Sequence, residues 1–409
     1  MADTLERQRS LVLTLLCLST IVNYIDRQSL AVVLPELRHQ LDLTSASYGN
    51  IATLFLIAYT VGQIGMGALI DRIGTRAGFI VSIVIWSIAA VLHSVVSSAR
   101  GLGVVRVILG IGESGNWPAG AKSVAEWFPK ERRAFAMGVF DGGSAVGAVI
   151  APPLMVWLTS RYGWRSAFVA TGLLGFLWLA AWMAIYRPPP RDPAAPVQPT
   201  RHRYAWSILR SRALWGLMLT RMLATPVWWF YVFWLPDYLS KGRGFSLQQI
   251  GYFAWIPFVT VDLGKILGGG ISDRLLRNHT ATLARKSVMA AAALCMMTGL
   301  FVVSAPNAAG AIAWVSLATF GFGMWSANIL ALHADVFSSD VMATAIGWTG
   351  TAASLGGAAF TWMIGQVVDL KGYAPVFAAT ALIAGLALIS LLVLLGRVER
   401  QNLPESVPA

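Results

Sequence analysis

The stretch Gly67-Ala-Leu-Ile-Asp-Arg-Ile-Gly-Thr-Arg76 returns in altered form as Gly269-Gly-Ile-Ser-Asp-Arg-Leu-Leu-Arg277. Within it, Asp71 and Asp273 are 202 residues apart. Three further pairs of segments match at offsets between 201 and 209 residues: Glu126–Gly138 with Asp335–Gly347, Gly163–Phe168 with Gly372–Phe377, and Pro35-Glu36 with Pro236-Asp237. Four matches at nearly one offset indicate an internal duplication, so we expect two halves with similar folds.

The composition places both halves in a membrane. Of the 409 residues, 56% are hydrophobic and 12% are charged, and the mean hydropathy is +0.63. Soluble proteins carry about 25% charged residues, so this chain has too few for a soluble surface. Cys17 and Cys295 lie far apart in apolar runs, which excludes a disulfide-rich secreted domain. The hydrophobic content also excludes a disordered chain.

Apolar runs long enough to cross a bilayer as helices, which takes about 20 residues, recur along the chain. We count twelve, near 11–35, 46–70, 77–98, 101–125, 133–159, 164–186, 211–239, 247–272, 283–305, 308–333, 341–368 and 374–396. They are continuous rather than alternating, which excludes barrel strands. The first holds Asp26 and Arg27, and no small-residue cleavage site follows it, so it is not a cleaved signal peptide.

The runs predict an all-α membrane protein of twelve transmembrane helices in two bundles. We expect six helices in residues 1–186, a linker over 187–210, and six helices in 211–409. The linker contains the proline-rich sequence RPPPRDPAAPVQPTRHR, which is typical of an extended connection.

The basic residues predict the orientation. The net charge of +12 would suggest nucleic acid in a soluble protein. Here, with the N-terminus inside, 19 Lys and Arg residues fall in inner segments and 7 in outer loops. Cytoplasmic loops carry such an excess, so we expect both termini in the cytoplasm.

Four charged residues lie deep within the expected spans of the first half: Asp26, Arg27, Arg106 and Glu113. A charge at the bilayer centre costs about 2.5–3.5 kcal/mol, so such residues are functional candidates. At the offsets of 201 and 209 residues, their counterparts in the second half are apolar or aromatic: Val227, Trp228, Val315 and Phe322. This asymmetry assigns ion chemistry to the first half and an aromatic wall to the second. A purely structural ion-pair cluster is the alternative.

The charged residues suggest how a proton and an anion could be coupled. A buried carboxylate is stabilised by a nearby arginine, and an anion that occupies this arginine removes the stabilisation. We therefore expect Asp26 beside Arg27, and Glu113 two turns from Arg106, to take up a proton when an organic anion binds. Asp26 and Glu113 are the proton-coupling candidates under this hypothesis.

Other polar residues in the runs give weaker signals. Asp262 and Lys265 are three residues apart and can pair with each other, while Lys265 is also a candidate substrate contact. Arg221 is expected to snorkel or to gate. His93 and His333 are expected to be structural. Further residues considered are Asp141, which lines the cavity or packs near the inner gate, Lys122 at the cytoplasmic interface, and the pair Trp228-Trp229, of which at least one should face the cavity.

The segment Gly67–Arg76 resembles the loop 2–3 signature of the major facilitator superfamily. In that signature the Asp and Arg can lock two halves together on the cytoplasmic side. Asp71, Arg72, Asp273 and Arg274 are therefore the gating candidates, and the alternative is a turn that obeys the positive-inside rule.

A closer likeness is to the anion:cation symporters, which include bacterial hexuronate and galactonate transporters and are related to sialin and the vesicular glutamate transporters. It rests on segments in both halves: Asn23–Arg27, Arg106 with Glu113, Pro118-Ala-Gly, Glu126-Trp-Phe-Pro-Lys-Glu-Arg, Ala151-Pro-Pro, Trp228-Trp-Phe-Tyr…Trp-Leu-Pro and Asp335-Val-Phe. The resemblance implies proton-coupled uptake of an organic anion, typically a sugar acid. The chain has Ser144 near the position where galactonate-type members have Gln, and it keeps an acid at Asp26 that hexuronate-type members can lack.

The resulting substrate-binding candidates come from both halves. Tyr24 and Tyr59 match cavity tyrosines of the family, and Arg27 and Arg106 match its arginines. The complete set is Tyr24, Arg27, Tyr59, Arg106, Ser144, Trp228, Trp229, Lys265, Asn328 and Trp348.

Other functional classes fit less well. An organic-anion exporter or exchanger, or a drug/H⁺ antiporter, is the alternative within transport, although buried arginines disfavour a cationic drug. No phosphate-binding Gly-x-x-x-x-Gly-Lys-[Ser/Thr] motif and no His-Glu-x-x-His motif occurs, so we expect neither an ATP-driven pump nor an enzyme. The expected protein is a monomer in a bacterial inner membrane, with the proton as coupling ion, no cofactor or metal, and no nucleic-acid partner.

Overall fold

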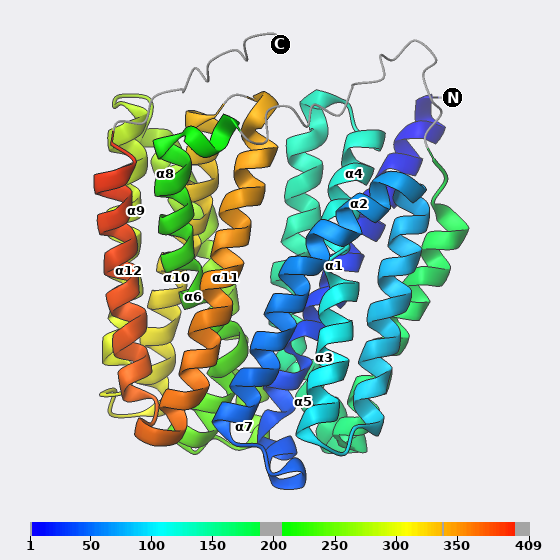
Figure 1. Ribbon diagram of the computed structural model, residues 1–409, viewed down its shortest axis with the longest axis vertical. Coiled ribbons are helices and arrows are strands. Elements are labelled where there is room, and N and C mark those ends of the chain that lie inside the picture. Colours follow the sequence, from blue (N-terminus) through cyan, green and yellow to red (C-terminus); the bar gives the residue numbers. More distant parts are fainter. Residues whose placement is uncertain (1, 189–206, 338, 397–409) are drawn as a thin grey trace. The chain divides into compact units, whose positions relative to one another are not determined.

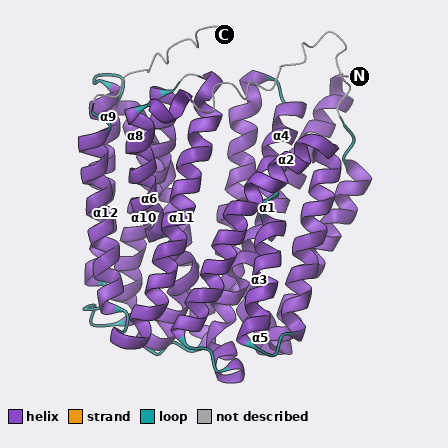
Figure 2. Ribbon diagram, in the orientation of Figure 1, coloured by secondary structure: helices purple, strands orange, loops and turns teal. Residues whose placement is uncertain are grey.

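A computed structural model describes residues 2–188, 207–337 and 339–396. These residues form helices and no strand (Figure 2). The main helices are α1 (Ala2–Leu41), α2 (Ser45–Leu92), α3 (Ala99–Glu113), α4 (Asn116–Trp127), α5 (Lys130–Ile185), α6 (Arg212–Asp237), α7 (Leu247–Phe253), α8 (Ile256–Leu275), α9 (Ala281–Met297), α10 (Ala308–Val336), α11 (Ser339–Lys371) and α12 (Ala374–Leu394).

Each of the twelve apolar runs is helical, which confirms the predicted fold class. Within the described residues, seven helical segments are long and apolar enough to cross a membrane, and two of them each contain two of the runs. The second and third runs are both in α2, which bends at Gly74, and the fifth and sixth are both in α5, which bends at Gly163. The fourth run divides into α3 and α4, and the eighth into α7 and α8.

Contacts group the chain into two compact units. The first contains residues 1–193, 232–255 and 361–370, and the second contains 194–231, 256–360 and 371–409. The first unit therefore includes the end of α6 and part of α11 besides the N-terminal helices. Most of the linker expected at 187–210 lies outside the described residues. The boundaries expected from the sequence, 1–186 and 211–409, remain a prediction.

Each unit is held together by long helix–helix contacts. In the first, α1 packs along α5, and α2 packs against α3 and α5 (Figure 1). In the second, α10 packs against α8 and α9, and α9 packs against α12. The middle of α1 and the end of α3 are thereby buried inside the first unit.

The duplication is visible in backbone geometry. Gly163 and Gly372, which match at the 209-residue offset, both have positive φ angles, 81° and 71°. A side chain disfavours this conformation, so glycine suits both turns. Gly112 and Gly321 match at the same offset and both lie against the backbone of a neighbouring helix. A Cβ atom would lie 2.6 Å from the Trp86 nitrogen at the first and 2.6 Å from the Ala292 oxygen at the second.

This packing predicts that Gly112→Ala destabilises the protein. The added methyl group meets rigid backbone, and overpacking of a well-packed interior costs about 1–3 kcal/mol. The matched control is Gly65→Ala in α2, where a Cβ atom would meet nothing within 4 Å. Thermal unfolding of both purified variants checks the prediction, which is wrong if Gly112→Ala unfolds at the temperature of Gly65→Ala.

Candidate functional site

A polar segment in the middle of α1 is buried within the first unit. Asn23, Asp26 and Arg27 are each at most 2% exposed. Asn116, the first residue of α4, holds this part of α1 beside the break between α3 and α4. Its amide nitrogen donates to Thr20 Oγ1 at 3.2 Å, and its amide oxygen accepts from Ser19 Oγ at 2.9 Å. The end of α3 is thereby positioned next to the charged residues of α1.

Arg27 and Glu113 form a fully buried ion pair across this contact. The Arg27 atoms Nε and Nη2 both lie 2.9 Å from Glu113 Oε2, and the two side chains are 1% and 0% exposed. Arg27 Nη2 also donates to Asn23 Oδ1 at 3.1 Å. The sequence suggested Asp26 with Arg27 and Glu113 with Arg106; the structure instead pairs Arg27 with Glu113.

Aromatic rings enclose the Arg27 guanidinium. Its central carbon lies 4.8 Å from the ring centre of Tyr24 and 4.6 Å from that of Tyr59, and Phe55 is 5.7 Å away. Cations over such rings gain electrostatic stabilisation that is stronger when water is excluded. The two tyrosines predicted to line a cavity therefore lie against Arg27.

Arg106 and Asp26 are buried with unused hydrogen-bonding capacity. Arg106 Nη1 donates to the backbone oxygen of Arg27 at 3.2 Å. Its Nε and Nη2 atoms, and both carboxylate oxygens of Asp26, have no hydrogen-bond partner among the described residues. Arg106 and Glu113 are the charges that act on Asp26. Thr171 on α5 is also close, but its hydroxyl donates to the Phe168 carbonyl.

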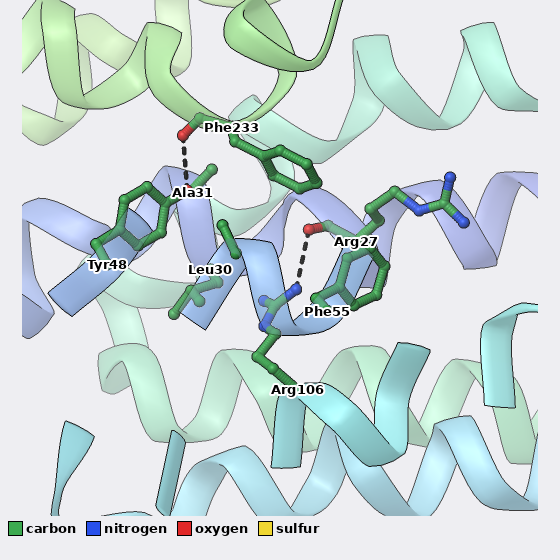
Figure 3. Close-up of a pocket in the computed structure, with 8 residues that line it drawn as sticks. Arg27, Leu30, Ala31, Tyr48, Phe55, Arg106 and Phe233 are labelled. Carbon is green, nitrogen blue, oxygen red and sulfur yellow. Dashed lines mark hydrogen bonds between the residues drawn. The ribbon is translucent and has the colours of Figure 1, made fainter. Parts of the chain in front are cut away.

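Both arginines line a small cavity (Figure 3). The Arg106 guanidinium points toward the backbone of Arg27, whereas the Arg27 guanidinium points away in another direction (Figure 3). Tyr48 closes the far side, where its hydroxyl donates to the Phe233 carbonyl at 2.6 Å. The lining residues are Arg27, Leu30, Ala31, Tyr48, Ala52, Phe55, Arg106 and Phe233. Its walls are apolar apart from the two arginines and Tyr48.

The second unit replaces the ion pair by an aromatic stack. Trp228 and Phe322 are the sequence counterparts of Arg27 and Glu113. Their rings are stacked with centres 5.4 Å apart and an angle of 7° between the planes. Phe258 meets Trp228 edge-on at 5.8 Å. The same positions thus carry a charged contact in one half and an apolar contact in the other.

The remaining binding candidates are dispersed. Lys265 lies 3.3 Å from Asp262, so the predicted pairing forms. Asn328 donates to the backbone oxygens of Gly268 and Met324 at 3.2 and 2.9 Å. Of the other candidates, Ser144 is buried on α5, Trp229 packs against Gly357 of α11, and Trp348 is half-buried on α11.

Of the four gating candidates, Asp71 and Asp273 form ion pairs within their own units. Asp71 accepts from Lys122 Nζ at 2.9 Å. Asp273 accepts from Arg285, which also donates to Asp335, both at 3.0 Å. In the described residues no salt bridge involves Arg72 or Arg274. The gating role of these four residues remains a prediction. No group of three or more His, Cys, Asp or Glu in the described part of the chain is placed to hold a metal ion.

A second charged cluster of the first unit was not identified from the sequence. Arg38, near the end of α1, donates through Nε and Nη2 to the two carboxylate oxygens of Asp237, both at 2.9 Å. Arg38 also donates to the Leu43 carbonyl at 2.7 Å. Lys241 donates to Ser45 Oγ at 2.9 Å. The repeat identified the Pro-Asp pair at 236–237. It did not identify Arg38 as the partner of Asp237, because the two are 199 residues apart in the sequence.

Asp369 completes this cluster at the beginning of α2. Its carboxylate accepts from the backbone nitrogens of Ser45 and Ala46 at 2.9 and 2.7 Å, where helices have unpaired N–H groups. Partial burial alone would raise the pKa of Asp369, but these N–H donors hold it below its ordinary value. A carboxylate at this position is also favoured by the helix dipole.

Asp369→Asn should therefore lower the free energy of unfolding by about 1 kcal/mol at neutral pH, because hydrogen bonds to a charged acceptor become weaker neutral ones. Chemical unfolding in detergent measures the effect. Asp42→Asn is the control, since Asp42 is exposed in the adjacent turn. Equal stability of the two variants would contradict the capping role.

The chain is similar to known proteins along most of its length. The family description "Major Facilitator Superfamily" matches residues 16–361. The hexuronate transporter of Escherichia coli (strain K12) is 34% identical over 392 residues, which cover 90% of each chain. The galacturonate transporter of Dickeya chrysanthemi is 33% identical over 301 residues, covering 69% of this chain and 87% of the relative.

A solved structure is similar in fold. It is that of a bacterial homolog of the human lysosomal transporter Spinster, in an inward-facing and unoccupied conformation. It aligns with a TM-score of 0.74 at 21% sequence identity, and the alignment covers 95% of each chain.

Proposed function

Because this chain belongs to the Major Facilitator Superfamily, we propose that it is a transporter that carries a small organic anion across the membrane together with a proton. The names of its relatives, which include a D-galactonate transporter, support a sugar acid, a hexuronate or an aldonate, as the anion. The family match and the multi-pass helical fold support a secondary transporter rather than an enzyme.

One observation carries the proposal: of two buried arginines, one is ion-paired within the described residues and the other is not. Arg27 is neutralised by Glu113, whereas Arg106 forms no ion pair among the described residues and keeps two unused donor atoms. A guanidinium matches a carboxylate with two parallel hydrogen bonds. Arg106 is therefore the anion-binding residue of the first unit in this proposal, and the small cavity beside it marks where the carboxylate would approach.

Asp26 is the proton-binding residue in this proposal. Its buried carboxylate lacks hydrogen-bond donors in the described structure, and Arg106 is a cation that acts on it. A carboxylate of the substrate that binds Arg106 cancels this favourable field and adds a negative charge. Protonation of Asp26 then removes the repulsion, so anion and proton favour each other's binding. Glu113, which stays paired with Arg27, is the second group that can take the proton.

The same physics argues against a cationic cargo. A positively charged drug would approach Arg27 and Arg106, and like charges repel strongly where water is excluded. Exchange or export of anions would use the same residues and differs only in which gradient drives the cycle.

The excess of basic residues in alternate loops supports cytoplasmic termini and a location in the bacterial inner membrane. With the proton gradient directed inward, the coupled cycle imports the anion. The gating candidates Asp71, Arg72, Asp273 and Arg274 then lie on the cytoplasmic side. We propose that one chain suffices, because all the coupling residues lie within one unit.

Uptake by proteoliposomes tests the proposal. The purified protein is reconstituted, an inward proton gradient is imposed without ATP, and the accumulation of labelled D-galacturonate and D-galactonate is measured. We expect accumulation that collapses when a protonophore is added. Flux of these anions that does not depend on the proton gradient would indicate an exchanger. The absence of flux for any organic anion would overturn the proposal.

A further inference from the structure

A further arginine without a carboxylate partner lies in the second unit. Arg221 on α6 is half-buried and forms no salt bridge with any Asp or Glu in the described residues. It is nine residues beyond Arg212, where α6 begins, which corresponds to about 13 Å along a helix. Arg221 therefore lies about a third of the way along the 26 residues of α6, inside the expected span. Lys265 and Arg285 of the same unit differ, because Lys265 pairs with Asp262 and Arg285 pairs with Asp273 and Asp335.

Neutral groups fix the position of the Arg221 guanidinium. Its Nη1 donates to Thr349 Oγ1 of α11 at 3.0 Å. His333 Nε2 of α10 lies 2.9 Å from the same Thr349 oxygen. His333 Nδ1 is 2.6 Å from the Ile329 carbonyl, which can only accept, so this nitrogen carries a proton. Thr349 Oγ1 also lies 2.9 Å from the Ala345 carbonyl, so its single hydrogen is shared between Ala345 and His333 while a lone pair accepts from Arg221.

This arrangement orients a cation without neutralising it. A residue that merely anchors a helix at the interface would direct its charge to water, and a structural charge inside the membrane is normally paired. Arg221 is instead held in one place by a hydroxyl group, while the other N–H donors of its planar guanidinium remain available. A guanidinium suits a carboxylate because two of its N–H groups match the two carboxylate oxygens.

We propose that Arg221, positioned by Thr349 and His333, is the anion-binding residue of the second unit and contacts a carboxylate of the transported organic anion. This inference rests on the proposed function and assigns a charged contact to the half whose sequence indicated only an aromatic wall. Arg221 is the binding residue, and Thr349 and His333 are positioning residues.

Binding measurements on purified protein test it. The probe is sodium D-galacturonate, titrated calorimetrically into the wild type and variants. Arg221→Gln should raise the Kd at least tenfold. Arg221→Lys should raise the Kd less, because the positive charge remains while the paired N–H donors of the guanidinium are lost. Arg212→Gln, at the exposed beginning of the same helix, should leave the Kd unchanged.

The Thr349 variants separate positioning from folding. Thr349→Val removes the hydroxyl at nearly constant volume and should weaken binding, whereas Thr349→Ser keeps the hydroxyl and should bind normally. These variants decide the question even if Arg221→Gln fails to fold.

The outcomes also separate the two proposals. If Arg106→Gln loses galacturonate binding while Arg221→Gln, Arg221→Lys and Thr349→Val all bind within twofold of the wild type, the assignment of Arg221 is wrong and the proposed function stands. If the wild type binds no carboxylate at all, both are wrong.

Discussion

Arg27→Gln should lower the free energy of unfolding by about 3–5 kcal/mol, which is the cost of removing one partner of a buried ion pair. Glu113 would remain buried, 0% exposed, with neither of the two ionic contacts that now reach its Oε2 atom. The cation that lies over Tyr24 and Tyr59 would also be lost. Chemical unfolding in detergent measures the effect.

The double variant Arg27→Gln/Glu113→Gln should recover most of this loss, because two neutral amides can hydrogen-bond to each other without a buried charge. The exposed pair of Lys122 and Asp71 provides the control. Lys122→Gln should cost less than about 1 kcal/mol, as exposed pairs do. A double variant that is as unstable as Arg27→Gln would show that uncompensated charge is not the cause.

Arg106→Gln should affect binding far more than stability. Truncation of one partner of a buried charged contact costs about 2–5 kcal/mol in a complex. The Kd for D-galacturonate should therefore rise roughly 100-fold, which corresponds to about 2.7 kcal/mol. The free protein loses one hydrogen bond, to the Arg27 carbonyl, and should be destabilised by no more than about 1.5 kcal/mol.

Arg100→Gln is the matched control, because Arg100 lies on the same helix and is exposed. Titration calorimetry and thermal unfolding should show this variant to be normal in both respects. If Arg106→Gln binds galacturonate as tightly as Arg100→Gln does, Arg106 is not the anion-binding residue. If it unfolds as easily as Arg27→Gln, its role is structural.

The fold could be predicted from the sequence because the membrane imposes it. Apolar runs of sufficient length can only be helices there, and all twelve formed. The repeat added correspondences such as Gly163 with Gly372, which share a backbone conformation. The merging of runs around Gly74 and Gly163 was less predictable, because a single left-handed glycine can turn the chain without ending the hydrogen-bonded pattern.

The members of the site were predictable, but their partners were not. Charges in apolar runs identify Asp26, Arg27, Arg106 and Glu113, since each is too costly to be accidental. Which acid meets which arginine depends on how α1 and α3 pack, and here Asn116 places Glu113 against Arg27. Arg38 and Asp237 were missed for the same reason, because nothing local in either segment indicates a bidentate contact.

The most direct test of the central claim, that anion and proton move together through the Asp26–Arg106 region, is a measurement of proton movement. D-galacturonate is added outside proteoliposomes that contain a pH-sensitive dye, with equal pH on both sides. The wild type should acidify the interior as the anion enters. Asp26→Asn should still exchange labelled galacturonate, but it should not acidify the interior of the proteoliposomes. Equal acidification by the wild type and Asp26→Asn, or entry of the anion without any proton in the wild type, would contradict the mechanism.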